Sequence, residues 1–501
     1  MRYSVRAIKP MACAAVILLA AAAAGYCATI FYDNFEPPVN LGLWTIGPPD
    51  WTSDHHDSLA GQNNHIRTPG VWGARSWVVW RDAWNSQHQL GAGYDGNVYL
   101  KCWMFEDNDI NWPPGPETQY EGWPNGYITL LNSAWLANPN GEGADAFSIG
   151  VMGEVGRVSG WLRDYFENCC VYTAEESYVM PVDDDNVPLV PRRQGWRKYT
   201  ILVNGYTGNP GDVQFFVDDK LVYNGLRRAA AGGGGGAPLD TIVLGSRWWT
   251  YETYYFDQVE FGTIEPAVPC DNISDALAQP DGTWVSLESK VVSGCFSYCD
   301  LPRGASPSYD KPFPGYLAIE EDDRSSALWV STSYQARVSA ASNMAQRIDV
   351  RGIMRTNEAG MRYLDAIEIS GAPELVAQPP VVGTTLRNLG SPLLDGKLVK
   401  VWGKVVNIPG SNPPTVRGQE RTGDWRRYFL IDDGSPGGPV KCYYNNIIAA
   451  KPGVDPVPAV ANGDYVSVVG VAGREVLVPG TTGPERSVWI RGAGDLVILK
   501  H

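Results

Sequence analysis

Short apolar runs broken by turn-forming residues dominate the chain after its first 28 residues. Between Thr29 and about Ile264, runs rich in Val, Ile, Tyr, Phe and Trp are interrupted by Gly, Pro, Asn and Asp, without a convincing amphipathic helical period. The clearest strands are predicted at 195–203 and 213–222, with a turn rich in Gly, Asn and Pro between them. Segments 30–36 and 254–261 are predicted as the first and last strands of this region. The pattern is typical of an all-β domain.

The C-terminal half repeats one β pattern. Asp281–Leu287 is followed by strands at 290–292, 315–320, 347–352 and 364–369, and Asp395–Val401 by strands at 404–406, 427–432, 463–470 and 494–499. A unit present twice, with loops of different length, indicates a duplicated domain rather than a solenoid. Residues 339–346 are the one predicted short helix, and the Pro-rich stretch 372–380 separates the two copies.

The N-terminus predicts a secretory signal peptide over residues 1–28. Arg2, Arg6 and Lys9 precede an Ala-rich apolar run over residues 11–24, and small residues follow it. This run is short for a membrane span, and no later segment approaches the required length. We therefore predict a secreted or cell-surface protein, with no transmembrane segment in the mature chain. Lipid attachment at Cys27 is the alternative to ordinary cleavage.

The predicted mature chain then divides into three domains, over 29–268, 269–372 and 381–501. Negative charge is concentrated in the first: residues 29–272 hold 14 Lys and Arg against 31 Asp and Glu, whereas residues 273–501 hold 23 against 24. The field of the first domain should repel polyanions and tolerate calcium or neutral ligands. Seven cysteines remain in an oxidising compartment, and the best disulfide candidates are Cys295 and Cys299, with Cys270 just before them.

The N-terminal region resembles the concanavalin A-like lectin/glucanase superfamily, of which laminin-G-like domains are a branch. The most specific part of the resemblance is the strand Gly195-Trp196-Arg197-Lys198-Tyr199 with its partner Phe215-Phe216-Val217-Asp218-Asp219-Lys220. The resemblance implies a two-sheet jelly roll, a β-sandwich whose first and last strands lie side by side. This superfamily includes glycosidases, polysaccharide lyases, lectins and adhesion domains, so the resemblance alone does not give the function.

Catalysis of glycoside cleavage would need two carboxylates placed on either side of a sugar bond. Jelly-roll glucanases present a Glu-x-Asp-x-x-Glu strand, which this chain lacks; 106–109 and 153–156 are the nearest segments. We therefore predict that the protein is not an enzyme, with a jelly-roll glycosidase or polysaccharide lyase as an alternative.

Tryptophans favour a binding role instead. Ten of the 19 lie between Trp44 and Trp135, and sugar rings stack on exposed aromatic faces. Residues in Pro- and Gly-rich loops or next to the last strand are the predicted ligand-binding residues: Trp112, Trp123, Trp248, Trp249 and Tyr251. The competing interpretation is that large aromatics fill the core.

Calcium is the one cofactor we consider. Asp33, Glu36 and Asp257 would approach one another if the terminal strands pair, and carboxylate oxygens suit this ion. The competing interpretation is that each carboxylate ends a strand or accepts a hydrogen bond from a turn amide. The histidines of the 55–65 loop have no fixed ligand spacing that would support a transition-metal site.

The two repeated modules resemble OB-folds, small Greek-key barrels, of the kind appended to secreted bacterial proteins. OB-folds bind single strands through a basic groove with stacking aromatics. Arg324, Trp329 and Tyr334 in the first copy, and residues 426–428 with Tyr443 in the second, are the residues available for such a face. The balanced charge of this half argues against nucleic acid and favours ordinary barrel-surface residues.

The sequence therefore predicts a secreted, non-catalytic binding protein. Its jelly roll is expected to recognise carbohydrate or another cell-surface polymer, and its OB-like modules to present the jelly roll or assist it. A structural or adhesion protein without a small-molecule ligand remains open beside the enzyme alternative.

Overall fold

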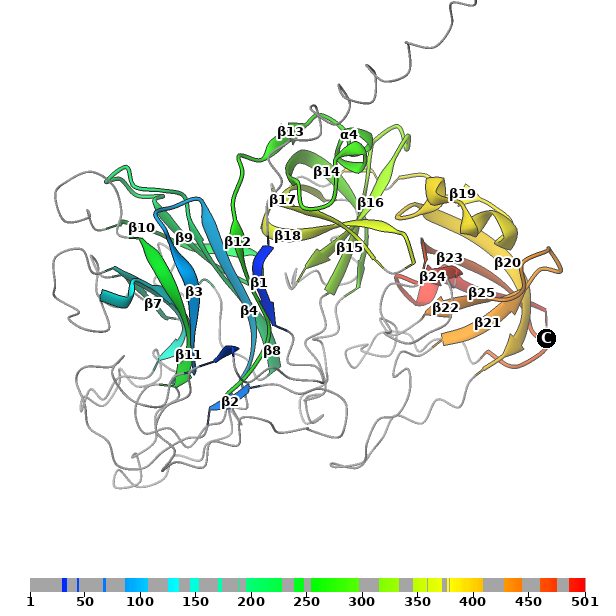
Figure 1. Cartoon of the computed structure of the whole chain (residues 1–501). Coiled ribbons are helices and arrows are strands. Elements are labelled where there is room, and N and C mark those ends of the chain that lie inside the picture. Colours follow the sequence, from blue (N-terminus) through cyan, green and yellow to red (C-terminus); the bar gives the residue numbers. More distant parts are fainter. Residues whose placement is uncertain are drawn as a thin grey trace, which may run out of the picture.

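The computed structural model places a β-sandwich and two β-barrels in series along the chain (Figure 1). It describes residues 29–33, 43–44, 66–68, 86–106, 125–134, 145–152, 170–173, 189, 195–227, 238–246, 254–296, 315–332, 346–357, 359–371, 376–377, 379–408, 428–443, 460–474 and 486–500. No helix within these ranges is long and apolar enough to cross a membrane.

Two antiparallel sheets form the N-terminal sandwich. In order across the sheet, the seven-stranded one contains β1 (Thr29–Asp33), β12 (Tyr254–Thr263), β4 (Val98–Glu106), β8 (Gly195–Val203), β9 (Val213–Val217) and β10 (Lys220–Gly225), with β2 (Ile66–Thr68) also on β12. The five-stranded one contains β3 (Ser86–Tyr94), β11 (Leu239–Ser246), β5 (Asn125–Leu131), β6 (Ala146–Met152) and β7 (Cys170–Thr173). β1 pairs antiparallel with β12, so the first and last strands lie side by side as predicted.

The core of the sandwich follows from the two-residue period of the strands. In β4, Val98, Leu100 and Cys102 are fully buried in the apolar cluster between the sheets, together with Ile128 and Leu130 of β5. The intervening β4 residues point to the opposite face, because successive side chains of a strand alternate.

One predicted strand, 213–222, is instead a hairpin. Asp218 and Asp219 have φ values of 51° and 62° and form a two-residue turn between β9 and β10. Turns of this kind favour Asn, Asp and Gly, because two positive φ values match the twist of the flanking strands. The Asp-Asp pair was the available signal for the turn.

The two C-terminal sheets each close into a five-stranded barrel. The first contains β14 (Trp284–Phe296), β15 (Gly315–Glu320), β16 (Ala327–Thr332), β18 (Arg362–Ser370) and β17 (Arg347–Thr356), and β17 returns to pair with β14. The second contains β20 (Leu398–Asn407), β21 (Tyr428–Asp432), β22 (Val440–Tyr443), β24 (Arg486–Trp489) and β23 (Tyr465–Arg474), and β23 returns to β20. In both, the third and fifth strands are parallel. The expected fold class, all-β with a sandwich and two small barrels, is confirmed.

Smaller elements decorate the barrels. The first is preceded by β13 (Val268–Cys270) and helix α4 (Ile273–Ala278); the second carries β19 (Val382–Gly383), the 3-10 turns η3 (Leu386–Gly390), η4 (Pro392–Leu394) and η5 (Ala493–Asp495), and β25 (Leu496–Lys500). Helix α4 was not predicted; it is a single capped turn, in which the Asn272 side chain accepts a hydrogen bond from the Asp275 amide. The predicted helix at 339–346 lies outside the described residues, apart from Gln346, which is in a β-bridge.

Each barrel docks on the preceding domain through the same face. Trp284 and Ile353 of the first barrel pack on Tyr99 of β4 in one apolar cluster. Their counterparts in the repeat, Leu398 and Val471, lie in the cluster that packs the second barrel on the first. The modules are therefore repeated in their mode of assembly as well as in their fold.

Equivalent glycines hold the two barrels closed. A Cβ on Gly352 would lie 2.3 Å from the backbone oxygen of Asp365, and one on Gly470 would lie 2.4 Å from that of Trp489. We expect Gly352→Ala and Gly470→Ala each to destabilise the protein by about 1–3 kcal/mol, since a backbone strand must move. Gly492→Ala, where nothing lies within 4 Å, is the control. Urea denaturation would measure the difference, and equal midpoints for all three variants would contradict it.

The described cysteines Cys102, Cys270 and Cys442 are free thiols. Cys299, the predicted partner of Cys295, lies outside the described residues, so that disulfide stays a prediction. Burial raises the pKa of the Cys102 and Cys442 thiols well above the usual range, which makes both poor nucleophiles.

Candidate functional site

The predicted ligand-binding aromatics lie outside the described residues, but the strand ends that anchor their segments are described. Trp112 and Trp123 lie between β4 and β5; Trp248, Trp249 and Tyr251 lie between β11 and β12. Both segments connect the seven-stranded sheet with the five-stranded sheet.

Backbone pairing brings the four strand ends together. Glu106, the last residue of β4, is opposite Tyr254, the first of β12. In the other sheet, Ser246 at the end of β11 is opposite Gly126 at the start of β5. The two segments therefore leave from the same end of the sandwich, which we call the aromatic end. Sequence spacing alone does not show this convergence, because it depends on strand pairing across more than a hundred residues.

Strands β5 and β11 of the five-stranded sheet reach the aromatic end, and the sheet has an outer face as well as a core face. The residues of the outer face alternate with those of the core, and they include the buried side chains of Thr129, Ser148 and Thr241. Thr129 Oγ1 and Ser148 Oγ are 2.7 Å apart, and the Thr241 hydroxyl lies 2.7 Å from Asp240 Oδ1 and 3.1 Å from Gln89 Oε1. The side chains of Thr129, Ser148 and Thr241 are polar and uncharged. Their chemistry suits hydroxyl groups better than ions.

The carboxylates predicted to bind calcium are separated by the sheet. Asp33 is opposite Val259 in the β1–β12 pair, and its Oδ2 accepts a hydrogen bond from Trp44 Nε1 at 2.8 Å. Asp257 follows the inward-facing Phe256, is buried on the other face, and accepts from the Gln258 amide. No group of three or more potential metal ligands occurs within the described ranges. The calcium prediction gains no support from this pair; Glu36 lies outside those ranges, and the prediction stays untested.

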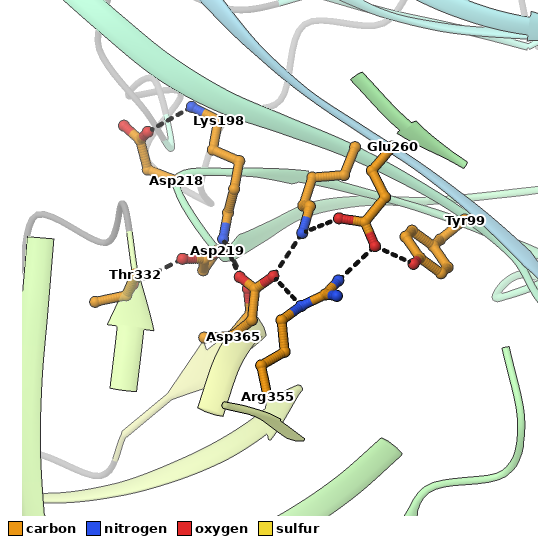
Figure 2. A network of polar contacts seen from close by, with 10 residues as sticks. Tyr99, Lys198, Asp218, Asp219, Glu260, Thr332, Arg355 and Asp365 are labelled. Carbon is orange, nitrogen blue, oxygen red and sulfur yellow. Dashed lines mark hydrogen bonds and ion pairs between the residues drawn. The ribbon is translucent and has the colours of Figure 1, made fainter. Parts of the chain in front are cut away.

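The outer face of the seven-stranded sheet carries a network of charged side chains against the first barrel (Figure 2). The Lys101 ammonium lies 3.0 Å from Glu260 on β12 and 2.6 Å from Asp365 on β18. Arg355 of β17 contacts the same two carboxylates. The Tyr99 hydroxyl donates to Glu260. Every cation here therefore faces an anion from the other domain.

The β9–β10 turn extends this network. Lys198 Nζ is 2.6 Å from Asp219 Oδ1 and donates to the backbone oxygen of Ala366 at 2.7 Å. The hydroxyl of Thr332 on β16 donates to Asp219 Oδ2 at 2.7 Å. The Asp219 backbone oxygen accepts from the amide of Ile369 at 2.8 Å. Figure 2 shows Lys198, Asp219 and Thr332 converging from both domains. The turn thus lies on the first barrel.

The electrostatics of this network suit assembly rather than catalysis. Burial by itself raises the pKa of Glu260, but the charges of Lys101 and Arg355 outweigh it and lower that pKa to about 2. Burial also raises the pKa of Asp365, but the charges of Lys101, Lys198 and Arg355 outweigh it and hold that pKa well below its usual range. Burial and the charge of Glu260 raise the pKa of Tyr99. None of these three groups titrates near neutral pH, as a general acid or base would.

The sequence pattern contained a signal for this network that we did not use. Lys101 lies in the run Val-Tyr-Leu-Lys-Cys-Trp-Met-Phe, and Lys198 in Trp-Arg-Lys-Tyr-Thr-Ile-Leu-Val. A lysine inside an otherwise apolar strand indicates a buried ion pair, because lysine is almost never fully buried without one. The partners were not predictable, since Asp365 lies 264 residues from Lys101.

Trp329 and Tyr443, which the sequence offered for an OB-type ligand face, lie between the two barrels. Trp329 and Tyr443 are buried in the apolar cluster that joins the two barrels, and Trp329 Nε1 donates to the Ala472 oxygen at 2.9 Å. Arg324 pairs with Glu320 and donates to the Leu398 oxygen. Tyr334 and residues 426–427 lie outside the described residues. Trp329, Tyr443 and Arg324 therefore hold the domains together.

Comparison with known proteins returns structures but no family. No family model matches the chain, and no curated protein does. The similar solved structures include one from work on endo-acting O-glycanases that the human gut microbiota express to initiate mucin breakdown (12% identity, TM-score 0.30, 48% of this chain and 100% of that one). Others are a galectin-like protein of unknown function from Bacillus subtilis (9%, 0.28, 48% and 98%) and the alginate lyase Aly36B (10%, 0.29, 47% and 98%). Likenesses this distant carry no argument about function.

Proposed function

We propose that this protein is a secreted, non-catalytic binding protein whose jelly roll recognises carbohydrate or another cell-surface polymer at the aromatic end. The observation that carries the proposal is the convergence of the strand ends, with Glu106 opposite Tyr254 and Ser246 opposite Gly126. It anchors the segments of Trp112, Trp123, Trp248, Trp249 and Tyr251 at one place. Aromatic faces and neutral hydroxyl partners are the groups that bind sugar rings.

Two further observations support the proposal. The outer face of the seven-stranded sheet is occupied by the first barrel, so that face is not available to a ligand. The strands of the five-stranded sheet contain one carboxylate, Asp240, whereas glycoside cleavage by this kind of fold uses a pair of them. The ring order and the parallel third and fifth strands of each barrel support the OB-fold resemblance. In the proposal the barrels are accessory domains that present the jelly roll.

The test is retention of the purified mature protein on a glycan and polysaccharide array, with and without calcium. Trp248→Ala and Trp123→Ala should each lower retention about tenfold, the effect of losing one stacked ring. Trp402→Ala, which removes an exposed tryptophan of the second barrel, should leave retention on neutral glycans unchanged. The same samples are assayed for new reducing or unsaturated sugar ends.

Each outcome decides between the functional classes. Loss of retention confined to Trp248→Ala and Trp123→Ala supports the proposal. Release of sugar ends contradicts the non-catalytic role and favours a glycosidase or lyase. Absence of retention across the array contradicts carbohydrate recognition and favours a structural or adhesion protein. Loss of retention on calcium removal would show that the ligand site needs the ion.

A further inference from the structure

The second barrel carries an exposed aromatic surface on strands β20, β23 and β25. Trp402, Tyr465, Val497 and Leu499 are 43%, 49%, 50% and 57% exposed. The neighbouring residues Val401, Val466 and Leu496 face the barrel core. Alternation along each strand therefore places Trp402, Tyr465 and Val497 together on the outer face.

Strand register makes these residues one continuous surface. Trp402 is directly opposite Ser467, and Ser467 is opposite Val497 on the next strand. Side chains directly opposite in neighbouring strands lie about 5 Å apart. We call Trp402, Tyr465, Ser467 and Val497 the outer aromatic face.

Three lysines surround this face. In the adjacent row, Tyr465 lies between Lys404 on β20 and Lys500 on β25. Lys400 Nζ lies 5.7 Å from the centre of the Trp402 ring. These lysines form no ion pair with a carboxylate of the described residues, although Asp432 is opposite Lys404 on β21.

The repeat provides an internal control for what the fold requires. The first barrel has Glu288 where the second has Trp402, and its strand β17 has Arg347 and Asp349 where β23 has Tyr465 and Ser467. Glu288 is exposed, and the Asp349 carboxylate accepts from the Ser289 amide. The barrel therefore closes with ordinary solvated residues at these positions, so its fold does not require the exposed tryptophan and tyrosine.

We infer that the outer aromatic face is a second binding site, for an anionic polysaccharide chain whose sugar rings carry carboxylates. Flat aromatic side chains stack on the rings, and the surrounding ammonium groups pair with the carboxylates. Lys404 and Lys500 are separated by two strand spacings, about 10 Å, which is comparable with the repeat of two linked sugar rings. An exposed apolar patch with a polar rim is typical of interaction sites.

A polymer with few, widely spaced negative charges fits this face better than a nucleic acid does. Single-strand binding uses a strongly basic groove that follows the phosphates. Here three lysines border the aromatics, and the whole chain has a net charge of −15. The site is separate from the aromatic end of the jelly roll, so this inference does not depend on the proposed function.

The test is isothermal titration of the full mature chain with oligogalacturonate, with the methyl-esterified oligomer as the uncharged match. Trp402→Ala and Tyr465→Ala should each weaken oligogalacturonate binding about tenfold. Lys404→Gln with Lys500→Gln should weaken it and reduce its salt dependence, because exposed charges are screened. Leu393→Ala, an exposed apolar residue of η4, should have no effect. Unchanged melting temperatures would show that the exposed-site variants fold.

Several outcomes would overturn the inference. Equal binding of the methyl-esterified oligomer would contradict recognition of the carboxylates. Loss on Trp248→Ala but not on Trp402→Ala would place binding in the jelly roll and leave the proposed function standing. Tighter binding of an oligothymidylate through Trp402 would make the face a nucleic-acid site. Dimerisation abolished by Trp402→Ala would make it a contact between copies, and an absence of all binding would also reject it.

Discussion

Replacing Asp365 by asparagine is expected to destabilise the protein by about 3–5 kcal/mol, the effect of removing one partner from a buried ion pair. Asp365 lies 2.6 Å from Lys101 and also contacts Arg355. Asparagine keeps the shape of the side chain but removes its charge. Those cations would remain between the jelly roll and the first barrel with too few anions, and the contact between the two domains should weaken first. Urea denaturation followed by tryptophan fluorescence would measure the loss.

Asp322→Asn is the matched control, since it makes the same chemical change in an exposed pair with Arg347. Exposed pairs contribute about 0–1 kcal/mol, so this variant should unfold close to the parent. Limited proteolysis of the Asp365→Asn protein should also release the N-terminal sandwich at lower denaturant concentrations. Equal unfolding midpoints for the two variants would show that the network of Figure 2 does not hold the domains together.

Replacing Trp329 by alanine is expected to cost about 3–5 kcal/mol at the contact between the two barrels. Its ring is buried at 3% exposure and lies 5.9 Å from the ring of Trp489 and 5.5 Å from that of Phe296. Removing it leaves a cavity that the surrounding strands cannot close without moving. The second barrel should therefore lose much of its attachment to the first. Thermal unfolding of the full chain would measure this as a lower transition temperature.

Trp402→Ala is the control of equal chemistry, because that tryptophan is 43% exposed, and it should change stability by less than about 1 kcal/mol. Trp329→Phe separates packing from hydrogen bonding. The phenylalanine variant lacks the hydrogen bond from Trp329 Nε1 to the Ala472 oxygen, but that oxygen still accepts from the Gly396 amide at 2.9 Å. The phenylalanine variant should therefore lose less stability than the alanine variant. If Trp329→Ala and Trp402→Ala were equally mild, the aromatic cluster would not be the contact that joins the barrels.

The face through which each barrel docks carries a charged residue in the first barrel and an aromatic residue in the second. Asp365 of the first barrel and Trp489 of the second occupy corresponding places, since each approaches the glycine that closes its barrel, Gly352 or Gly470. Asp365 enters an ion network with the jelly roll, whereas Trp489 enters an aromatic cluster with the first barrel. A duplicated module has thus kept its docking geometry while the docking residues were adapted to different neighbours.

The corresponding outward face of the second barrel is more polar. Lys441 stands where the first barrel has Trp329, and its ammonium lies 5.0 Å from the centre of the Tyr428 ring.

The sequence by itself determined the local and repeated features of this protein. Period-two alternation fixes which side chains of a strand share a face, so the strand at 195–203 follows from composition along the chain, and the one predicted at 463–470 is β23 with shifted ends. The segments predicted as two strands at 395–401 and 404–406 are the single strand β20. The duplication showed two equivalent modules, and the paired first and last strands followed from the resemblance. Asp218–Asp219 also contained its turn signal locally, although we predicted a single strand over 213–222.

Only the tertiary structure decided which outer faces are covered and which are open. Lys101 and Trp402 each lie on the outer face of a strand, yet Lys101 is buried against Asp365 and Trp402 is exposed. A strand's own pattern distinguishes its two faces but does not show what packs on the outer one. That depends on contacts between residues hundreds of positions apart, whose free energy arises only when whole domains meet.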